Sequence, residues 1–448
     1  MDRFKVEEPM SQEKVNLNRR SLFASSAGGA VTAVLAGKLA GSENREGKPS
    51  GMKITNLKTY MFNVVTGPVR LDSNTGQPIS SGFKTWLFLK LETNAGVSGW
   101  GEGSGEWISP IVETAIHGWK ELLVGRDPLD VTAICDDITD RIPWKGGPII
   151  GSAIAAVNMA LYDIAGKSLD VPVHQLLGGR QRDRILIYDN GGLNFDSIDQ
   201  ARSQSRAAVE SGARGLKGNP LEGRTWAMDR RELDHCVDIV RAVREDVGDD
   251  VELLLDTHGS PAPELSLAFA HAVSPYRPLF LEEPCKVGSV DVLKEISQKS
   301  PVPIATGEKL FAYRDFKEVI DARACAFLQP DISHCFGIDN FLDLSRVAEY
   351  AQMLMAPHNA SGPIHFAALL QADAVVRNFL IQEVSGTWFR RFDEFIEHDF
   401  RLQEGFVNLP TRPGLGIEVK EKDIAKLPYD KAMTYRQYRH ADGSWKGW

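Results

Sequence analysis

The chain has few cysteines and no excess of positive charge. Its 448 residues include five cysteines, an odd number without paired spacing, which argues against a disulfide framework and against a cysteine zinc site. We therefore expect free, mostly buried thiols. The formal net charge is -9, and a nucleic-acid partner requires a basic face. The composition thus argues against nucleic-acid binding, and an anionic substrate must be attracted locally, by a metal or a few cations.

Near the N-terminus, the only apolar stretch is short. Residues 22–37 are rich in Ala and Gly and too polar for a stable membrane span. They follow Arg19-Arg20 and precede further small residues, a combination typical of a twin-arginine export signal. We expect residues 1–45 to be this signal and the mature protein to be periplasmic, with no membrane segment. The alternative is a disordered extension on a cytoplasmic protein.

A Gly-rich dinucleotide fingerprint is also lacking. From about residue 184, short apolar runs alternate with amphipathic helical segments, which predicts repeated βα units. Eight such strands indicate a closed (β/α) barrel; an open doubly wound sheet is the alternative. Upstream, residues 52–64 and 85–103 are β-rich, and residues 109–177 have helical periodicity. The polar segment 66–81 between the β-rich stretches predicts a lid loop.

Polar side chains stand at the ends of consecutive predicted barrel strands, where the catalytic groups of such barrels lie. A single acid there is more often a helix cap than a catalyst. Seven strands ending this way on one rim are hard to explain by structure alone, because crowded like charges repel one another. The residues are Lys217, Asn219, Asp256, His258, Glu282, Glu283, Glu308, Asp331, His358 and Glu383.

Three of these acids predict a bound cation. Asp256, Glu282 and Glu308 follow successive strands and should converge. Carboxylates without cysteine suit a hard metal, Mg²⁺ above all. Zinc is less suitable, because no histidine pair has zinc-like spacing. The neighbouring acid Glu283 leaves open which carboxylate of that pair faces inward.

Two histidines are candidates for proton transfer. Asp331 and His358 end neighbouring strands, and a carboxylate that orients an imidazole makes a plausible general base. Asp256 and His258 lie two residues apart at a strand end, so they should point the same way. They are two metal ligands, a charge pair, or a ligand beside a proton donor. His365, two residues after a Gly-Pro pair, either reaches the site or simply begins a helix.

With these residues located, the chain resembles a known family. The segments "SAIAAVNMALYDIAGK", "LKGNP", "DTHG", "PYRPLFLEEP", "PIATGEKLF", "LQPDISHCFGI", "APHNASGPI" and "IQEV" are similar to the enolase superfamily, in its mandelate racemase-like branch. Within that branch they look most like the D-galactonate dehydratase group. Two segments differ from that group's pattern: "DTHGS" stands where the group has "DFHGR", and "HNASGPI" stands where it has "HCPLGPI".

The resemblance implies a (β/α)7β-type TIM barrel with an α+β N-terminal capping domain that the C-terminal segment completes. The expected boundaries are 52–180 for the capping domain, 181–405 for the barrel and 406–448 for the returning segment. It also implies a small-molecule acid-sugar substrate and a homo-oligomer.

The resemblance further implies roles for the rim residues. Asp256, Glu282 and Glu308 would bind Mg²⁺, and His358 paired with Asp331 would be the base. His258 would be the general acid, and Glu383 would hydrogen-bond the substrate carboxylate. Lys217 and Asn219 match a "KxN" motif, so the second lysine that racemases use as a base is absent. The implied reaction is Mg²⁺-dependent dehydration of an aldonate such as galactonate to a 2-keto-3-deoxy acid. Epimerisation, racemisation or cycloisomerisation by the same chemistry is the alternative, and a catalytically silent sugar-acid binder is a third.

Overall fold

The structure is a computed structural model that describes residues 51–65, 67, 71, 76, 82–144, 146–221, 230–430 and 443. The predicted export signal, residues 1–45, lies outside the described residues. Most of the predicted lid loop, residues 66–81, does so too.

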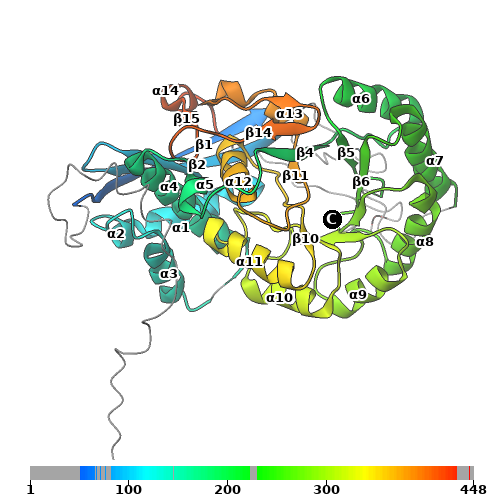
Figure 1. Cartoon of the computed structure of the whole chain (residues 1–448), viewed down its shortest axis with the longest axis horizontal. Helices are drawn as coiled ribbons and strands as arrows, with labels where there is room; N and C mark the ends of the chain where they lie inside the picture. Colours follow the sequence, from blue (N-terminus) through cyan, green and yellow to red (C-terminus); the bar gives the residue numbers. More distant parts are fainter. Residues whose placement is uncertain are drawn as a thin grey trace, which may run out of the picture. The chain divides into compact units, whose positions relative to one another are not determined.

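The N-terminal part of the chain, which we call the cap, joins an antiparallel sheet to a set of helices (Figure 1). The sheet has the order β1 (Ile54–Val65), β2 (Phe83–Thr93), β3 (Ser98–Glu102). A one-turn 3-10 helix (Glu106–Ile108) follows β3. The helices are α1 (Ser109–Gly118), α2 (Lys120–Leu123), α3 (Val131–Arg141), α4 (Pro148–Leu169) and α5 (Val173–Leu176).

Helix α4 packs directly against β3 because two glycines remove the side chains between them. A Cβ atom on Gly101 would lie 1.9 Å from the carbonyl oxygen of Ala156, and one on Gly99 would lie 2.1 Å from that of Ala160. Among the described residues, α4 is the one helix long and apolar enough to cross a membrane, but 83% of its most apolar window is buried in the protein. It is the core helix of the cap.

The second part is a barrel of eight parallel strands. They are β4 (Arg184–Asn190), β5 (Gly215–Gly218), β6 (Glu252–Asp256), β7 (Phe280–Glu282), β8 (Ile304–Thr306), β9 (Phe327–Leu328), β10 (Leu354–Met355) and β11 (Gln382–Val384). Between them run α6 (Ile198–Glu210), α7 (Arg230–Val247), α8 (Pro263–Val273), α9 (Val290–Lys299), α10 (Tyr313–Ala322), α11 (Ile338–Tyr350) and α12 (Pro363–Asp373).

The sheet closes on itself, because β11 pairs with β4, and Met355 of β10 pairs with Phe379 just before β11. The alternative of an open doubly wound sheet is therefore wrong, and the predicted (β/α)7β barrel with an α+β cap is confirmed.

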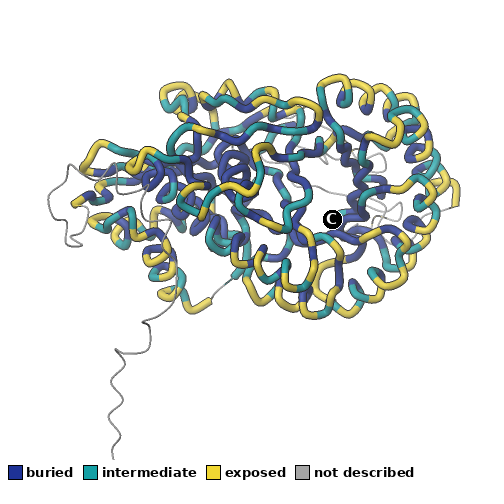
Figure 2. The backbone as a smooth tube through the Cα atoms, in the orientation of Figure 1, coloured by how far each residue is buried: buried dark blue, intermediate teal, exposed yellow. Residues whose placement is uncertain are grey.

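Burial explains why these segments form a barrel. The strands are covered on both faces, as parallel strands between helices and a packed interior must be (Figure 2). In β6, for example, Leu253, Leu254 and Leu255 are all buried. Most of the helices bury one face: in α10 the buried residues are Phe316, Val319 and Ile320, the spacing of a single helical stripe. Helix α12 is the exception, because all its residues are buried. A cluster of strand residues fills the barrel interior: Tyr188, Leu254, Phe280, Ala305, Ala356 and Ile381.

The C-terminal segment departs from the expected boundary at residue 406. Strand β14 (Phe406–Asn408) pairs with the start of β4, so this part extends the barrel sheet. The chain returns to the cap further on. The backbone N–H of Leu415 donates to Asp163 of α4 at 2.9 Å. Glu421, in α14 (Glu421–Ile424), pairs with Lys90 of β2 at 2.6 Å.

All five cysteines are free and buried, as predicted. They have no role at the barrel rim described next.

Candidate active site

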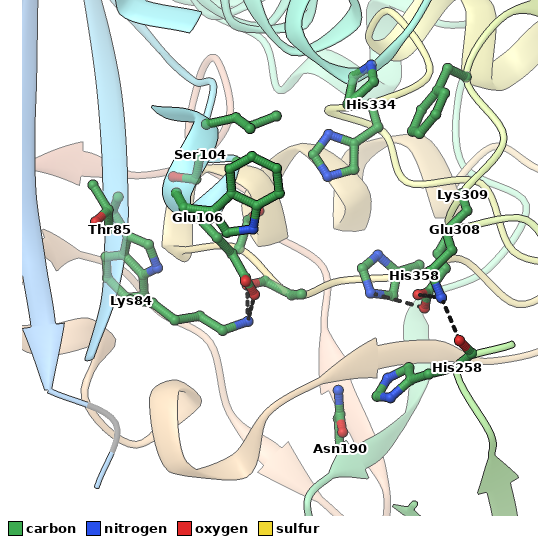
Figure 3. Close-up of a pocket in the computed structure, with 18 of the residues that line it drawn as sticks. Lys84, Thr85, Ser104, Glu106, Asn190, His258, Glu308, Lys309, His334 and His358 are labelled. Carbon is green, nitrogen blue, oxygen red and sulfur yellow. Dashed lines mark hydrogen bonds and ion pairs between the residues drawn. The ribbon is translucent and has the colours of Figure 1, made fainter. Parts of the chain in front are cut away.

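Half of the rim residues predicted from the sequence line one cavity of about 320 Å³: Lys217, Asn219, His258, Glu308 and His358. The other five lie buried behind this lining: Asp256, Glu282, Glu283, Asp331 and Glu383. From the barrel side it is lined by Asn190, Lys217, Asn219, His258, Glu308, Lys309, His334 and His358. From the cap it is lined chiefly by Lys84, Trp86, Glu106, Trp107 and Ile108. In Figure 3 the two groups face each other, with His258, Glu308 and His358 close together and the Lys84–Glu106 pair on the opposite wall.

Lys217 lies at the centre of the acidic residues and is almost fully buried. Its Nζ is 2.8 Å from Glu282, 2.9 Å from Glu383 and 3.2 Å from Asp256. Burial alone would lower the pKa of Lys217, but the charges of Glu282 and Glu383 outweigh it and raise the pKa well above its ordinary value. Lys217 is therefore a permanent cation that compensates part of the buried negative charge.

The metal-ligand candidates retain capacity for a cation. Asp256, Glu282 and Glu308 each have one buried carboxylate oxygen that accepts no hydrogen bond from the described residues. Two of these oxygens still lie near a histidine nitrogen: Asp256 Oδ2 is 3.1 Å from His258 Nε2, and Glu308 Oε2 is 3.4 Å from His358 Nε2. Uncompensated buried carboxylate oxygens are costly, and a hard divalent cation is what such a donor set accommodates. Ligand atoms of Asp256, His258 and Glu308 lie within 4.8 Å of one another, whereas Glu282 is turned toward Lys217. The residues present thus fit a metal ion.

The carboxyl pKa values differ across this group. Burial raises the pKa of Glu282 well above its ordinary value, and the nearby charge of Asp256 adds to the effect. For Glu308, burial is outweighed by the charges of His358 and Lys309, which lower its pKa to about 2. Asp256 behaves in the same way, because His258 and Lys217 hold its pKa well below the usual range against the effect of burial.

His358 and Asp331 form the expected dyad. They lie in a parallel β-bridge beyond β10 and β9, and His358 Nδ1 is 2.8 Å from Asp331 Oδ2. This leaves Nε2 on the cavity side, 3.4 Å from Glu308 Oε2. Burial would lower the pKa of His358, but the charges of Glu308 and Glu383 and the bond to Asp331 raise it to about 10. Because Glu308 is the largest raising cause, a cation that neutralises Glu308 makes His358 a better proton acceptor near neutral pH.

His258 reaches the site by a turn and not by strand alternation. Strand β6 ends at Asp256, and His258 has a left-handed backbone with φ of 52°. Its backbone N–H donates to Asp256 Oδ1 at 2.9 Å, and its Nε2 lies 3.1 Å from Asp256 Oδ2. Asn219 contacts the other ring nitrogen, Nδ1, at 3.2 Å. Burial opposes protonation, but the charge of Asp256 prevails and the pKa of His258 is raised. A protonated imidazole is the form that a general acid requires.

The structure also separates the two acids after β7. Glu282 contacts Lys217, whereas Glu283, with a φ of 46°, turns the other way and pairs with Lys309. Burial, with the added charge of Glu308, raises the pKa of Glu283 to about 8. Of the pair, Glu282 lies on the side of Lys217 and Asp256, and Glu283 lies on the side of Lys309.

Glu383, on β11, is held from three sides. It accepts hydrogen bonds from Tyr188 at 3.0 Å, from the Asn190 side chain, and from the backbone N–H of Asn359 at 3.2 Å. Asn190 ends β4 and was missed in the sequence, although the rule that found the other strand ends applies to it equally. Its side chain belongs to the cavity wall.

The cap residues of the cavity could not be found from the sequence. Lys84 Nζ is 2.6 Å from Glu106 Oε1, and it lies 4.6 Å from the ring centre of Trp388. Lys84 is the second residue of β2, and Glu106 is the first residue of the short 3-10 helix after β3, so neither carries a periodic signal. Only their position, across the cavity from His258 and Glu308, marks them as potential substrate contacts.

This combination of a capped (β/α)7β barrel and an acidic rim with two histidines defines a class of protein. The chain matches the family model "Mandelate racemase / muconate lactonizing enzyme, N-terminal domain" over residues 62–178 and "Enolase C-terminal domain-like" over residues 200–423. It belongs to this family of the enolase superfamily.

Among characterised sequences, the chain is similar to two bacterial proteins named D-galactonate dehydratase. That of Variovorax paradoxus (strain S110) is 37% identical over 81% of this chain and 96% of its own length. That of Cronobacter sakazakii (strain ATCC BAA-894) is 35% identical over 89% of this chain and 100% of its own.

Solved structures agree in fold. A crystal structure from Mesorhizobium loti superposes with a TM-score of 0.75 at 28% identity, covering 84% of this chain and 99% of that one. A member of the enolase superfamily from Salmonella Typhimurium has a TM-score of 0.73 at 22% identity, covering 84% and 98% respectively. The second likeness concerns the fold alone.

Proposed function

We propose that the protein is a hydro-lyase that dehydrates an acid sugar, an aldonate such as galactonate. In this reaction the proton on C2, next to the carboxylate, is removed and the hydroxyl on C3 leaves as water. The resulting enol becomes a 2-keto-3-deoxy acid. The observation that carries the proposal is the pair of imidazoles, His358 and His258, that line one cavity beside the same acidic group. The D-galactonate dehydratase relatives support the same substrate class.

We propose that Asp256, Glu282 and Glu308 hold Mg²⁺. A divalent cation there would stabilise the negative charge that develops on the substrate carboxylate as the C2 proton leaves. The support is that ligand atoms of Asp256 and Glu308 lie within 4.8 Å of each other and of His258, and that the buried Oε2 of Glu282 accepts no hydrogen bond among the described residues.

The proton steps belong to the chain's own residues. His358 accepts the C2 proton at Nε2, because Asp331 holds Nδ1 and with it the ring orientation. His258 donates a proton to the leaving C3 hydroxyl, since Asp256 favours its protonated form. The family resemblance gives Glu383 a hydrogen bond to the substrate carboxylate; Glu383 is buried behind the cavity and accepts from Asn190, which lines it, so we propose that it acts beside this amide. Two steps, proton removal and water loss, are thus divided between two imidazoles.

A second reaction, epimerisation or racemisation at C2, is favoured by one specific feature. His258 is paired with Asp256 at 3.1 Å much as His358 is paired with Asp331 at 2.8 Å. Two carboxylate-paired imidazoles could exchange a proton from opposite faces without loss of water. Asn219 beside His258 stands where racemases of the family carry a lysine, which counts against this reaction.

The deciding experiment incubates the purified protein with Mg²⁺ and a library of acid sugars in D₂O. Appearance of a keto acid supports dehydration, and deuterium at C2 without a keto acid supports epimerisation. If neither product forms with any acid sugar, both proposals are wrong. A His258→Asn variant then tests the division of roles: the dehydration mechanism predicts that C2 exchange persists while water loss falls by about 10²–10⁴-fold, the usual contribution of one general acid.

A further inference from the structure

Asp331 has an imidazole on each of its two carboxylate oxygens. His358 Nδ1 is 2.8 Å from Oδ2, and His365 Nε2 is 3.2 Å from Oδ1, an ion-pair distance without hydrogen-bond geometry. Oδ1 also accepts from the backbone N–H groups of Ser333 and His334, at 2.8 Å and 3.1 Å. His365 is fully buried and is not part of the cavity lining, so it cannot touch a substrate. Its Nε2 faces the carboxylate that orients the base.

The other side of the His365 ring holds the chain beside the base. Its Nδ1 is 2.8 Å from the side-chain oxygen of Asn359, the residue that follows His358. The backbone N–H of Asn359 donates to Glu383 at 3.2 Å. The imidazole of His365 therefore spans from Asp331 to Asn359, and both ends of this span touch groups that set the position of His358.

The backbone of His365 is itself anchored by the cap. Its N–H, in the first turn of α12, donates to Glu102 Oε2 at 2.9 Å. The N–H of Gly362 donates to Oε1 of the same carboxylate at 2.6 Å. A Cβ on Gly362 would lie 2.7 Å from Glu102 Oε1, so the glycine allows this close approach. Helix α12 thus begins at a fixed place, and His365 extends from it toward the dyad.

We propose that His365 is a positioning residue for the catalytic base, acting by holding Asp331 and Asn359 on the two sides of His358. The inference rests on the proposed function in one respect, that His358 is the group that removes the C2 proton. A shift of the base by a fraction of an ångström lowers the rate of proton transfer, while substrate and metal still bind. The signature is thus a loss of kcat at nearly constant KM and constant Mg²⁺ affinity.

Three variants separate this role from ordinary core stability. In His365→Asn the amide nitrogen takes the place of the ring atom Nδ1, and nothing takes the place of Nε2. The contact with Asn359 is therefore kept, and the contact with Asp331 is lost. In His365→Gln the longer amide reaches Asp331. The matched control is His174→Asn: His174 is also buried, and its Nδ1 is 2.8 Å from Gln371 of the same helix, α12, but it lies outside the cavity.

The kinetic test measures kcat and KM for C2 exchange and for keto-acid formation, the melting temperature, and Mg²⁺ affinity by calorimetry. We expect His365→Asn to lower kcat by about 10–100-fold at an unchanged KM, the scale of a small misplacement. His365→Gln should recover most of this loss. His174→Asn should lower the melting temperature and leave kcat unchanged. If His365→Asn retains wild-type kcat, or if kcat falls in His174→Asn as much as in His365→Asn, the inference is overturned.

A second measurement does not depend on a substrate. In the Mg²⁺-loaded protein, the Nδ1 proton of His358 shared with Asp331 should give a downfield proton resonance, assigned by its loss in His358→Gln. This resonance should shift or vanish in His365→Asn and remain in His174→Asn. An unchanged resonance in His365→Asn overturns the inference. If no acid sugar reacts with the wild-type protein, the proposed function fails, and this resonance alone decides the role of His365.

Discussion

At the scale of single residues, Lys217 is a buried cation that compensates several buried carboxylates. Its ammonium group lies within 3.2 Å of three buried carboxylates. Removing one partner of a buried ion pair usually costs about 3–5 kcal/mol, because the remaining charge is uncompensated. We expect Lys217→Met to lose stability on that scale in urea denaturation with a chelator, and to recover part of it with excess Mg²⁺. The exposed pair Lys299–Glu295 provides the control, since Lys299→Met should cost under about 0.5 kcal/mol. A similar cost for both variants would contradict this assignment.

Asp373, at the end of α12, is a buried acid whose two carboxylate oxygens accept no hydrogen bond from the described residues. Burial raises its pKa well above the ordinary value, although the charge of Arg182 opposes this. The unfolded chain therefore ionises Asp373 at lower pH than the folded protein does, and stability falls as pH rises from about 4 toward the folded pKa.

Asp373→Asn should remove this loss. We expect its melting temperature to match that of the wild type near pH 4 and to exceed it increasingly at higher pH, corresponding to about 1–3 kcal/mol. Melting curves from pH 4 to pH 8 check the prediction. Asp249, an exposed acid whose pKa is lowered by the hydrogen bond from Arg277, is the control, because Asp249→Asn should show no such gain. A pH-independent difference for Asp373→Asn would disprove the explanation.

At the scale of elements, the start of α12 depends on an acid from another part of the chain. Glu102, at the end of β3, accepts from Ser104 Oγ and from the backbone N–H groups of Gly362 and His365. These N–H groups have no partner within the helix, and an acceptor with negative charge stabilises that end.

Glu102→Gln would place an NH₂ group opposite one of these donors. We expect a loss of about 1–3 kcal/mol in chemical denaturation. Glu264→Gln, in the exposed first turn of α8, should cost under about 1 kcal/mol. If Glu102→Gln and Glu264→Gln lose the same stability, Glu102 interacts with the helix dipole only as an exposed acid does, and its hydrogen bonds to α12 add nothing.

At the scale of the whole molecule, a cation bound to the folded rim should stabilise the protein. The ligand candidates come from three separate strand ends, so the unfolded chain offers no comparable site. At a Mg²⁺ concentration 100 times the Kd, the expected stabilisation is about 2.7 kcal/mol. The melting temperature should therefore rise with the logarithm of the Mg²⁺ concentration, and Glu308→Gln should shift the rise to higher concentration. A melting temperature that does not respond to Mg²⁺ would argue against the metal site.

The barrel, its strand ends and their common rim could be predicted from the sequence because they follow local rules. Apolar runs alternate with amphipathic helices, and polar residues follow the runs, from Lys217 to Glu383. The alternation of side chains along a strand predicted orientation less well at two places. After β6, which ends at Asp256, the left-handed residue His258 changes the direction of the chain, and after β7 Glu283 does the same. Backbone turns of this kind depend on the neighbouring strand and its loops, which no single segment encodes.

The sequence by itself determined which residue types stand at which strand end, since that follows from chain order and periodicity. Only the tertiary structure decided which of these charged side chains pair with one another. Lys217 pairs with Glu282, leaving His258 beside Asp256 and Glu308. His365 lies against Asp331, and Lys84 with Glu106 forms the far wall of the cavity. Contacts of this kind join residues far apart in the chain: Glu102 and His365, for example, are 263 positions apart. Their geometry comes from the closure of the barrel and from the packing of the cap, and it leaves no trace in local sequence patterns.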